Sequence, residues 1–170
     1  TIYEVPLKMQ EQNMDEIVLR KLGMPIGEKP EMQPWRDFLS KKKHAKNTIK
    51  IGLVGKYVEL PDAYKSINES LLQAATYNEH KLDLHFILSD KLTEENIEKT
   101  LSSMDGILIA PGFGQRGMEG KIHALKYARE HDIPTFGVCL GMQCMVVEFA
   151  RNVLGLEEAN STEMNTHTPF

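Results

Sequence analysis

A cysteine flanked by glycines is the residue best suited to chemistry in this sequence. Gly137-Val138-Cys139-Leu140-Gly141 lies between a short apolar stretch and an apolar segment with helical spacing. A strand-to-helix turn forces strained backbone angles on its central residue, and small neighbours let a substrate reach that side chain. The positive end of the following helix dipole favours an anion at this position. A nucleophile is therefore one of two interpretations of this pattern.

The chemistry expected of such a nucleophile is attack on a carbonyl carbon. The backbone N–H of Leu140 would then face the oxyanion that forms. Free cysteines are more often buried side chains that pack as small hydrophobes. The pentapeptide alone leaves both interpretations open.

A glycine-rich turn is the second candidate. Ala110-Pro111-Gly112-Phe113-Gly114-Gln115-Arg116-Gly117 contains the glycine spacing of a dinucleotide-binding fingerprint. That fingerprint belongs in the first strand-to-helix turn of its unit, whereas this turn follows the third predicted strand, so we reject the interpretation. We expect instead an oxyanion hole in which the N–H of Gly112 approaches the developing charge.

The elements that must position both candidates alternate between strand and helix. The predicted strands are 48–55, 82–88, 106–110 and 133–138, and the predicted helices are 62–77, one capped by Thr93, one with Ile122, Leu125 and Ala128 inward, and 140–154. This alternation predicts an α/β fold with a doubly wound, mostly parallel sheet. Ligands bind beyond the carboxyl ends of such strands, where the turn 111–117 and Cys139 both fall.

The residues before the first predicted strand have a different character. We expect an extended piece at 2–6, a helical pattern that Gly23 ends, and a proline-containing linker with a short helical piece at 35–39. The basic run Lys41-Lys42-Lys43-His44 is typical of a solvated linker face. The chain thus divides into 1–24, a linker at 25–47, and an α/β domain at 48–170.

Composition and charge argue against several classes of protein. The net charge of −4 arises from scattered charges of both signs, which argues against a nucleic-acid partner. No apolar run approaches the roughly 20 residues that cross a bilayer, and no signal-peptide pattern is present, so we expect a cytoplasmic protein without a membrane partner. Cys139 and Cys144 would point apart on a helix and fit no zinc pattern, so we predict neither a disulfide nor a metal site.

The residues around Cys139 resemble a known nucleophile signature. The stretch 134–145, Pro-Thr-Phe-Gly-Val-Cys-Leu-Gly-Met-Gln-Cys-Met, is similar to that of class I glutamine amidotransferases. The resemblance implies a flavodoxin-like fold in which Cys139 forms a glutamyl thioester and ammonia is released from glutamine. It also implies that Gly112, Phe113 and Gln143 bind the glutamine. Cys144 is then expected to pack in the core.

Other stretches resemble the CTP synthases among these enzymes. They are Gly55-Lys56-Tyr57 with Asp62-Ala63-Tyr64, Asn160-Ser161-Thr162-Glu163, Ile2-Tyr3-Glu4-Val5-Pro6, and Arg116-Gly117-Met118-Glu119-Gly120-Lys121. The resemblance implies that Lys56 and Tyr57 form an interdomain or regulatory loop, and that Glu163, on a further strand, binds the α-amino group of glutamine. Taken singly, the first pair could equally form an ordinary loop and Glu163 a solvated carboxylate. Ala110-Pro111-Gly112 departs from the usual Pro-Gly-Gly of that family's turn.

The same resemblance implies the activity of a larger parent enzyme. Such an enzyme is a homotetramer that converts UTP to CTP with ATP, Mg²⁺ and glutamine-derived ammonia, and GTP activates it. The chain opens with Thr1, contains no Gly-x-x-x-x-Gly-Lys-Ser/Thr loop, and has no histidine followed two residues later by Glu. We therefore expect a piece of a longer protein that lacks the catalytic His and Glu. Attack without that base forfeits a factor of about 10⁴ or more, so we expect little activity from the piece alone.

Two other functions stay open at this point. The chain could belong to an amidotransferase subunit that serves another synthase, such as an anthranilate or GMP synthase. It could also be a degenerate amidotransferase fold that acts only as a binding module.

Overall fold

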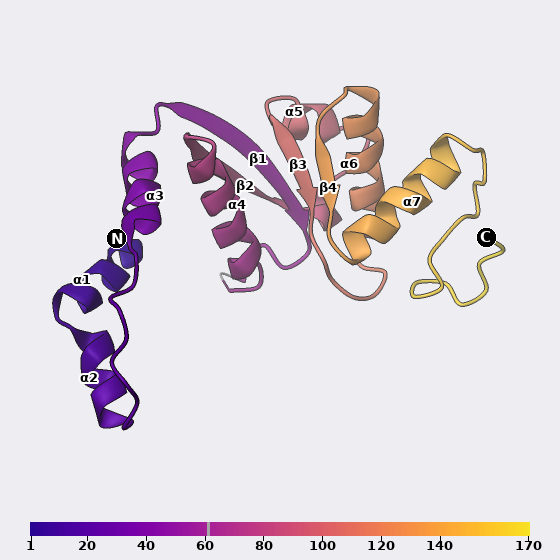
Figure 1. Ribbon diagram of the computed structural model, residues 1–170. Coiled ribbons are helices and arrows are strands. Elements are labelled where there is room, and N and C mark those ends of the chain that lie inside the picture. Colours follow the sequence, from indigo (N-terminus) through magenta and orange to yellow (C-terminus); the bar gives the residue numbers. More distant parts are fainter. Residues whose placement is uncertain (61) are drawn as a thin grey trace.

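A parallel sheet with helices on both faces forms the centre of the protein. The computed structural model describes residues 1–60 and 62–170. The helices α1, α2 and α3 lie at one end of the molecule, and α7 and the C-terminal segment lie at the other (Figure 1). Residues 153–170 contain turns but no helix or strand.

The sheet has four strands in the order β2-β1-β3-β4, all of them parallel. Their bounds are β1 (Asn47–Gly55), β2 (His80–Leu88), β3 (Gly106–Ile109) and β4 (Thr135–Gly137). The chain passes from β1 to β2 on one side and then to β3 and β4 on the other, so the strand order reverses between β1 and β3. The predicted α/β class and doubly wound sheet are confirmed.

Alternating side chains of the strands face two separate cores. Leu53 and Leu108 point to the face that α4 (Lys65–Tyr77) covers, where Tyr64 joins the same cluster. Val54 and Ile109 point to the opposite face. There they pack beneath α5 (Ile97–Leu101), α6 (Met118–Glu130) and α7 (Leu140–Asn152). This alternation follows from the period of two along a strand.

The N-terminal segment is helical, so the extended piece predicted at 2–6 is wrong. A 3-10 helix spans Ile2–Glu4 and is followed directly by α1 (Val5–Glu11). Pro6 lies in the first turn of α1, where its missing N–H costs nothing. Among the described residues no strand pairs with this segment, and helical turns satisfy its backbone groups locally. The helical pattern before Gly23 is confirmed as α2 (Met14–Lys21).

The helix α3 (Gln33–His44) is longer than the piece predicted at 35–39. The basic run forms its last turn, where positive charge complements the helix dipole. It is not simply a solvated face, because Lys41 donates to the carbonyl of Tyr77 at 3.2 Å and Lys42 Nζ lies 5.4 Å from the centroid of the Tyr3 ring. These contacts hold α3 against α4 and the N-terminal segment.

The start of α5 also differs from the prediction. Thr93 was expected to cap this helix, but α5 begins at Ile97 and Asn96 is the residue before it. The Asn96 side chain accepts from the N–H of Thr93 at 3.0 Å and donates to the carbonyl of Lys91 at 2.7 Å. This local pairing closes a turn that delays the helix.

A fully buried lysine lies on the inward face of α6. Lys121 occupies the face that also carries Met118, Ile122 and Leu125, and its Nζ donates to the carbonyl of Ala110 at 2.7 Å. Burial lowers the pKa of Lys121, although the nearby Cys144 thiol acts in the opposite direction. The cation therefore carries an energetic cost in the folded protein.

The pH dependence of stability tests this cost. The pKa of Lys121 is 10.5 in the unfolded chain and lower in the folded chain. Between these two pKa values the unfolded chain binds more protons at this site, so the free energy of unfolding increases as the pH rises. We expect Lys121→Met to remove this gain. The stability of the variant relative to wild type should then fall as the pH rises from 7 to 9.5 in urea titrations.

A comparison of two variants separates Lys121 from other titrating groups. Lys121 and Cys144 influence each other's pKa, so both proteins in the comparison carry Cys144→Ala, which removes the titration of the thiol. Lys126→Met, on a less buried side of the same helix, removes a lysine that is not fully buried and is the matched control. A difference between Lys121→Met and wild type that stays constant with pH would contradict the buried-cation interpretation.

Candidate active site

Cys139 forms the predicted sharp bend between β4 and α7. It has a φ of 53° and a ψ of −111°, and it directly precedes the first residue of the helix. Such angles cost a residue with a side chain about 1–3 kcal/mol, and strain of this kind concentrates at functional sites. The N–H of Gly141 donates to the carbonyl of Val138 at 2.8 Å and closes the turn. The Cys139 side chain is exposed.

Both flanking glycines are required by close backbone packing. A Cβ on Gly137 would lie 2.6 Å from the carbonyl carbon of Gly141. A Cβ on Gly141 would lie 2.2 Å from the carbonyl oxygen of Ile109, the last residue of β3. Neither obstacle is the end of a flexible side chain. The first turn of α7 therefore lies directly against the end of β3.

The glycine-rich turn emerges beside Cys139, as the sequence predicted. Ile109 pairs with Gly137, and the N–H of Val138 donates to the carbonyl of Ile109 at 3.1 Å. Gly112 and Cys139 thus follow neighbouring strands at the same edge of the sheet. Gly112 is buried and Phe113 is exposed. The N–H of Leu140, at the start of α7, has no acceptor within its own helix, and its role in an oxyanion hole with Gly112 stays a prediction.

Lys56 holds the glycine-rich turn from the end of β1. It is 4% exposed, and its Nζ donates to the carbonyls of Phe113 and, at 3.2 Å, Gly114. A Cβ on Gly112 would lie 2.8 Å from Lys56 Cε, so glycine allows this close contact. Burial lowers the pKa of Lys56, and the charge of Arg116 lowers it further. The lysine replaces solvent as the partner of these two carbonyls.

Arg116 attaches the far end of the turn to two other strands. It donates to the carboxylate of Asp90, which follows β2, and to the carbonyl of Lys56 at 3.0 Å. Its guanidinium carbon lies 5.7 Å from the centroid of the Tyr57 ring, within cation–π range. Lys56 and Tyr57 therefore contact the glycine-rich turn itself. Whether they also form an interdomain loop stays a prediction.

The two polar residues predicted to bind glutamine lie in contact. Gln143, in the first turn of α7, donates from Nε2 to Glu163 Oε2 at 3.0 Å. Ser161 donates from Oγ to Gln143 Oε1 at 2.6 Å. The sequence reasoning gave Ser161 no role, although it lies in the stretch that was singled out around Glu163.

The strand predicted around 160–163 is wrong, because this segment forms a turn. The N–H of Ser161 donates to Asn160 Oδ1 at 2.9 Å, and the N–H of Met164 donates to the carbonyl of Ser161 at 2.9 Å. Asn and Ser side chains favour such local bonds over a sheet ladder. Gln115 anchors the turn further by donating to the carbonyl of Met164 at 2.5 Å. Glu163 thus reaches the site from a turn.

The second thiol and two of the histidines lie away from the nucleophile. Cys144 is fully buried, which confirms that it packs in the core, and burial raises its pKa. His131 follows the end of α6, at the opposite edge of the sheet from Cys139, and its ring stacks on Tyr127 with centroids 4.0 Å apart. His123 lines a small surface hollow with Glu94 and Lys126. Neither histidine is placed as a base for Cys139.

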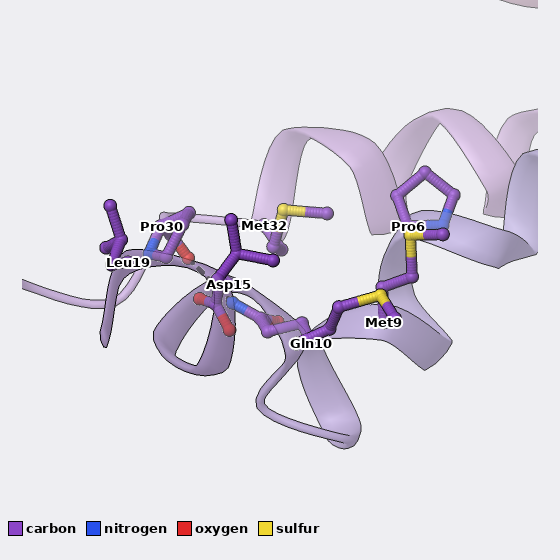
Figure 2. Close-up of a pocket in the computed structure, with 9 residues that line it drawn as sticks. Pro6, Met9, Gln10, Asp15, Leu19, Pro30 and Met32 are labelled. Atoms are coloured by element: carbon purple, nitrogen blue, oxygen red, sulfur yellow. Dashed lines mark hydrogen bonds between the residues drawn. The ribbon is translucent and has the colours of Figure 1, made fainter. Parts of the chain in front are cut away.

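An apolar hollow also lies elsewhere. A pocket of about 600 Å³ is formed by α1, α2 and the segment before α3. Met9, Leu19 and Met32 point into it, and Gln10 bonds to the carbonyl of Pro30 at 3.0 Å (Figure 2). Cys139 and the glycine-rich turn contribute nothing to its wall. The chemistry therefore lies at the strand ends.

Two kinds of feature are absent from residues 1–60 and 62–170. Within these ranges, no group of three or more His, Cys, Asp or Glu side chains is arranged to hold a metal ion. In the same part of the chain, no helix has the length and apolar character needed to span a bilayer.

The close packing at Gly141 makes a sharp prediction. Gly141→Ala must displace the start of α7 from β3, which we expect to cost about 2–3 kcal/mol of unfolding free energy and to alter the exposure of Cys139. Urea denaturation and the rate of Cys139 modification by a small thiol reagent measure the two effects. Gly27→Ala is the matched control, because a Cβ there has no neighbour within 4 Å. Equal behaviour of the two variants would contradict the packing argument.

Comparison with known proteins gives a consistent set of relatives. The family model described as glutamine amidotransferase class-I matches residues 59–169. The chain is similar to the CTP synthase of Porphyromonas gingivalis, with 63% identity over 167 residues that cover 98% of this chain and 31% of the relative. It is 59% identical to the CTP synthase of Bacteroides fragilis over 168 residues, which cover 99% of this chain and 32% of the relative. The chain thus spans about a third of the length of these curated relatives.

A solved structure shares the fold. The glutaminase domain of Trypanosoma brucei CTPS with bound acivicin matches with a TM-score of 0.67 and 38% sequence identity. The match covers 72% of this chain and 48% of that one.

Proposed function

The chain belongs to the class I glutamine amidotransferases, and we propose that it carries the nucleophile of a glutamine-dependent CTP synthase. The observation that carries the proposal is the exposed Cys139 thiol on a strained bend beside the glycine-rich turn. The CTP synthases of Porphyromonas gingivalis and Bacteroides fragilis, at 63% and 59% identity, support this assignment over that of a subunit serving another synthase. The strain at Cys139 supports an enzyme over a binding module, because strained backbone angles concentrate at functional sites.

In the proposed reaction the Cys139 thiolate attacks the side-chain carboxamide carbon of glutamine. The carbonyl π bond opens and leaves negative charge on oxygen, which the N–H groups of Gly112 and Leu140 stabilise. The carbon–nitrogen bond then breaks, and nitrogen leaves as ammonia after taking up a proton. Water hydrolyses the resulting thioester to glutamate and the free thiol. Phe113 contacts the bound glutamine from the tip of the turn.

Gln143 and Glu163 fix the other end of the substrate in this proposal. Gln143 lies in the first turn of α7, and its N–H donates to the carbonyl of Cys139 at 3.2 Å, so the start of the helix joins the two residues. The Glu163 carboxylate, hydrogen-bonded to Gln143, offers its remaining oxygen to the α-amino group of glutamine. A cationic group beside a carboxylate forms a charge-assisted bond, which is stronger than a neutral one.

The chain accounts for only part of the whole activity. We propose that 1–24 ends a synthetase domain, that 25–47 is a linker, and that 48–170 belongs to the amidotransferase domain. The whole enzyme would convert UTP to CTP with ATP and Mg²⁺, with GTP as activator, in a cytoplasmic homotetramer. The described residues offer no fitting metal cluster, so we assign no magnesium ligand to this chain. The histidine base and its carboxylate partner are likewise assigned to no residue within it.

Covalent labelling tests the role of Cys139. We expect acivicin, the ligand of the related glutaminase domain, to modify Cys139 in the full-length enzyme, as read by peptide mass spectrometry. Residues 1–170 alone should react much more slowly, because a nucleophile without its base forfeits a factor of about 10⁴. Cys139→Ala should abolish labelling and glutamine-dependent CTP formation while ammonia-dependent formation persists.

The second cysteine supplies the matched control. Cys144 is fully buried and should not react, so Cys144→Ala should label like wild type. Full-length protein that remains unlabelled, or that labels elsewhere than Cys139, would overturn the proposed function.

A further inference from the structure

Ser161 closes a ring of hydrogen bonds between the residues proposed to hold the substrate. Its Oγ donates to Gln143 Oε1 at 2.6 Å, and Gln143 Nε2 donates to Glu163 Oε2 at 3.0 Å. The N–H of Glu163 returns to Ser161 Oγ at 3.2 Å. The three residues thus form one closed circuit in which each bond has a donor and an acceptor.

The circuit allows only one orientation of the Gln143 amide. The Glu163 carboxylate can only accept, so the NH₂ group of Gln143 faces it, and the Ser161 hydroxyl donates its proton to the Oε1 on the other side of the amide. A flipped amide would place Oε1 against the carboxylate of Glu163, where two acceptors repel. Ser161 therefore stabilises the orientation in which Gln143 presents its NH₂ group to Glu163. Without this hydroxyl, rotation of the amide would break the bond that holds the carboxylate.

Apart from the bond that the Ser161 hydroxyl accepts from the N–H of Glu163, backbone bonds and core packing hold the turn that carries Ser161. The carbonyl of Ser161 accepts from the N–H groups of Met164 and Asn165, each at 2.9 Å. Met164 is buried in the core, and Gln115 donates to its carbonyl at 2.5 Å. Removal of the Ser161 hydroxyl should therefore release the Gln143 amide and Glu163 while the turn keeps its place.

We propose that Ser161 is a positioning residue that sets the preference of the site for amides bearing an α-amino group. The inference rests on the proposed function, in which Glu163 receives that group. Ser161 touches neither the nucleophile nor the oxyanion donors in this scheme. Its effect reaches the substrate through Gln143 and Glu163, so it governs recognition of the amino group and leaves the chemical step at Cys139 unchanged.

The test compares two substrates in the full-length enzyme. Glutaramate is glutamine without its α-amino group, so it cannot use Glu163 in the same way. We expect Ser161→Ala to lower kcat/KM for glutamine about 5- to 10-fold, mainly through KM, the effect of one lost hydrogen bond. The kcat/KM for glutaramate should stay within about 2-fold of wild type.

Further variants separate this role from a general structural one. Ser161→Thr keeps a hydroxyl and should restore the preference for glutamine, and Thr162→Ala, at the exposed neighbouring position, should behave like wild type. Gln143→Leu removes another member of the circuit without altering the turn, so it should reproduce the selective loss. The double variant Gln143→Leu/Ser161→Ala should lose no more kcat/KM for glutamine than the worse of the two single variants, because both substitutions break the same circuit.

The outcomes distinguish this inference from the function on which it rests. Equal losses for glutamine and glutaramate, or a fall in kcat at unchanged KM, would overturn the positioning role while the amidotransferase function stands. Unchanged kinetics of Ser161→Ala on glutamine would do the same. A wild-type enzyme without any glutaminase activity would overturn the proposed function and this inference together.

Discussion

The close approach between the first turn of α7 and the end of β3 is the constraint on which the rest of the site depends. A Cβ on Gly141 would lie 2.2 Å from the carbonyl oxygen of Ile109, which leaves no room for a side chain. The backbone of Gly141 excludes a Cβ on Gly137 in the same way. These contacts allow the chain to reverse within a single residue. Cys139 therefore takes a strained conformation and projects its thiol from the surface, beside the glycine-rich turn.

A second constraint concerns the carbonyl groups at the strand ends. The loops that leave a parallel sheet carry carbonyls that have no ladder partner, and each needs a donor. Here cationic side chains supply the donors: Lys121 for Ala110, Lys56 for Phe113 and Gly114, and Arg116 for Lys56. With these carbonyls tied to cations, the turn keeps one conformation near Cys139. Two of these cations, Lys121 and Lys56, are buried, and positive charge at this edge of the sheet suits a reaction that develops an oxyanion.

The elements that the sequence predicted well are those whose apolar spacing is local. The sequences of strands β1 to β3 and of helices α4, α6 and α7 each contain the apolar periodicity of their own element. The glycines on either side of Cys139 predicted the bend. The extended structure predicted at 2–6 and 160–163 is wrong because a strand needs a neighbouring strand to pair with. The sequence of a short segment does not show whether such a neighbour is present. Lys121 could have been suspected as a charge among the inward positions of α6. The hydrogen bond between Ser161 and Gln143 could not have been predicted, because it joins residues 18 positions apart in the sequence.

The two halves of the proposed substrate site are therefore held by different means. Gln143 lies in the first turn of α7 and Cys139 directly precedes that helix, so the packing of the helix start against β3 sets the positions of both. Glu163 arrives on a turn with no ladder of backbone bonds, so side chains must fix its position relative to the helix. Gln115 ties the turn to the glycine-rich loop, and Ser161 ties it to Gln143. Because chemistry resides on the helix and amino-group recognition on the turn, changes to the turn can alter substrate preference while the nucleophile keeps its geometry.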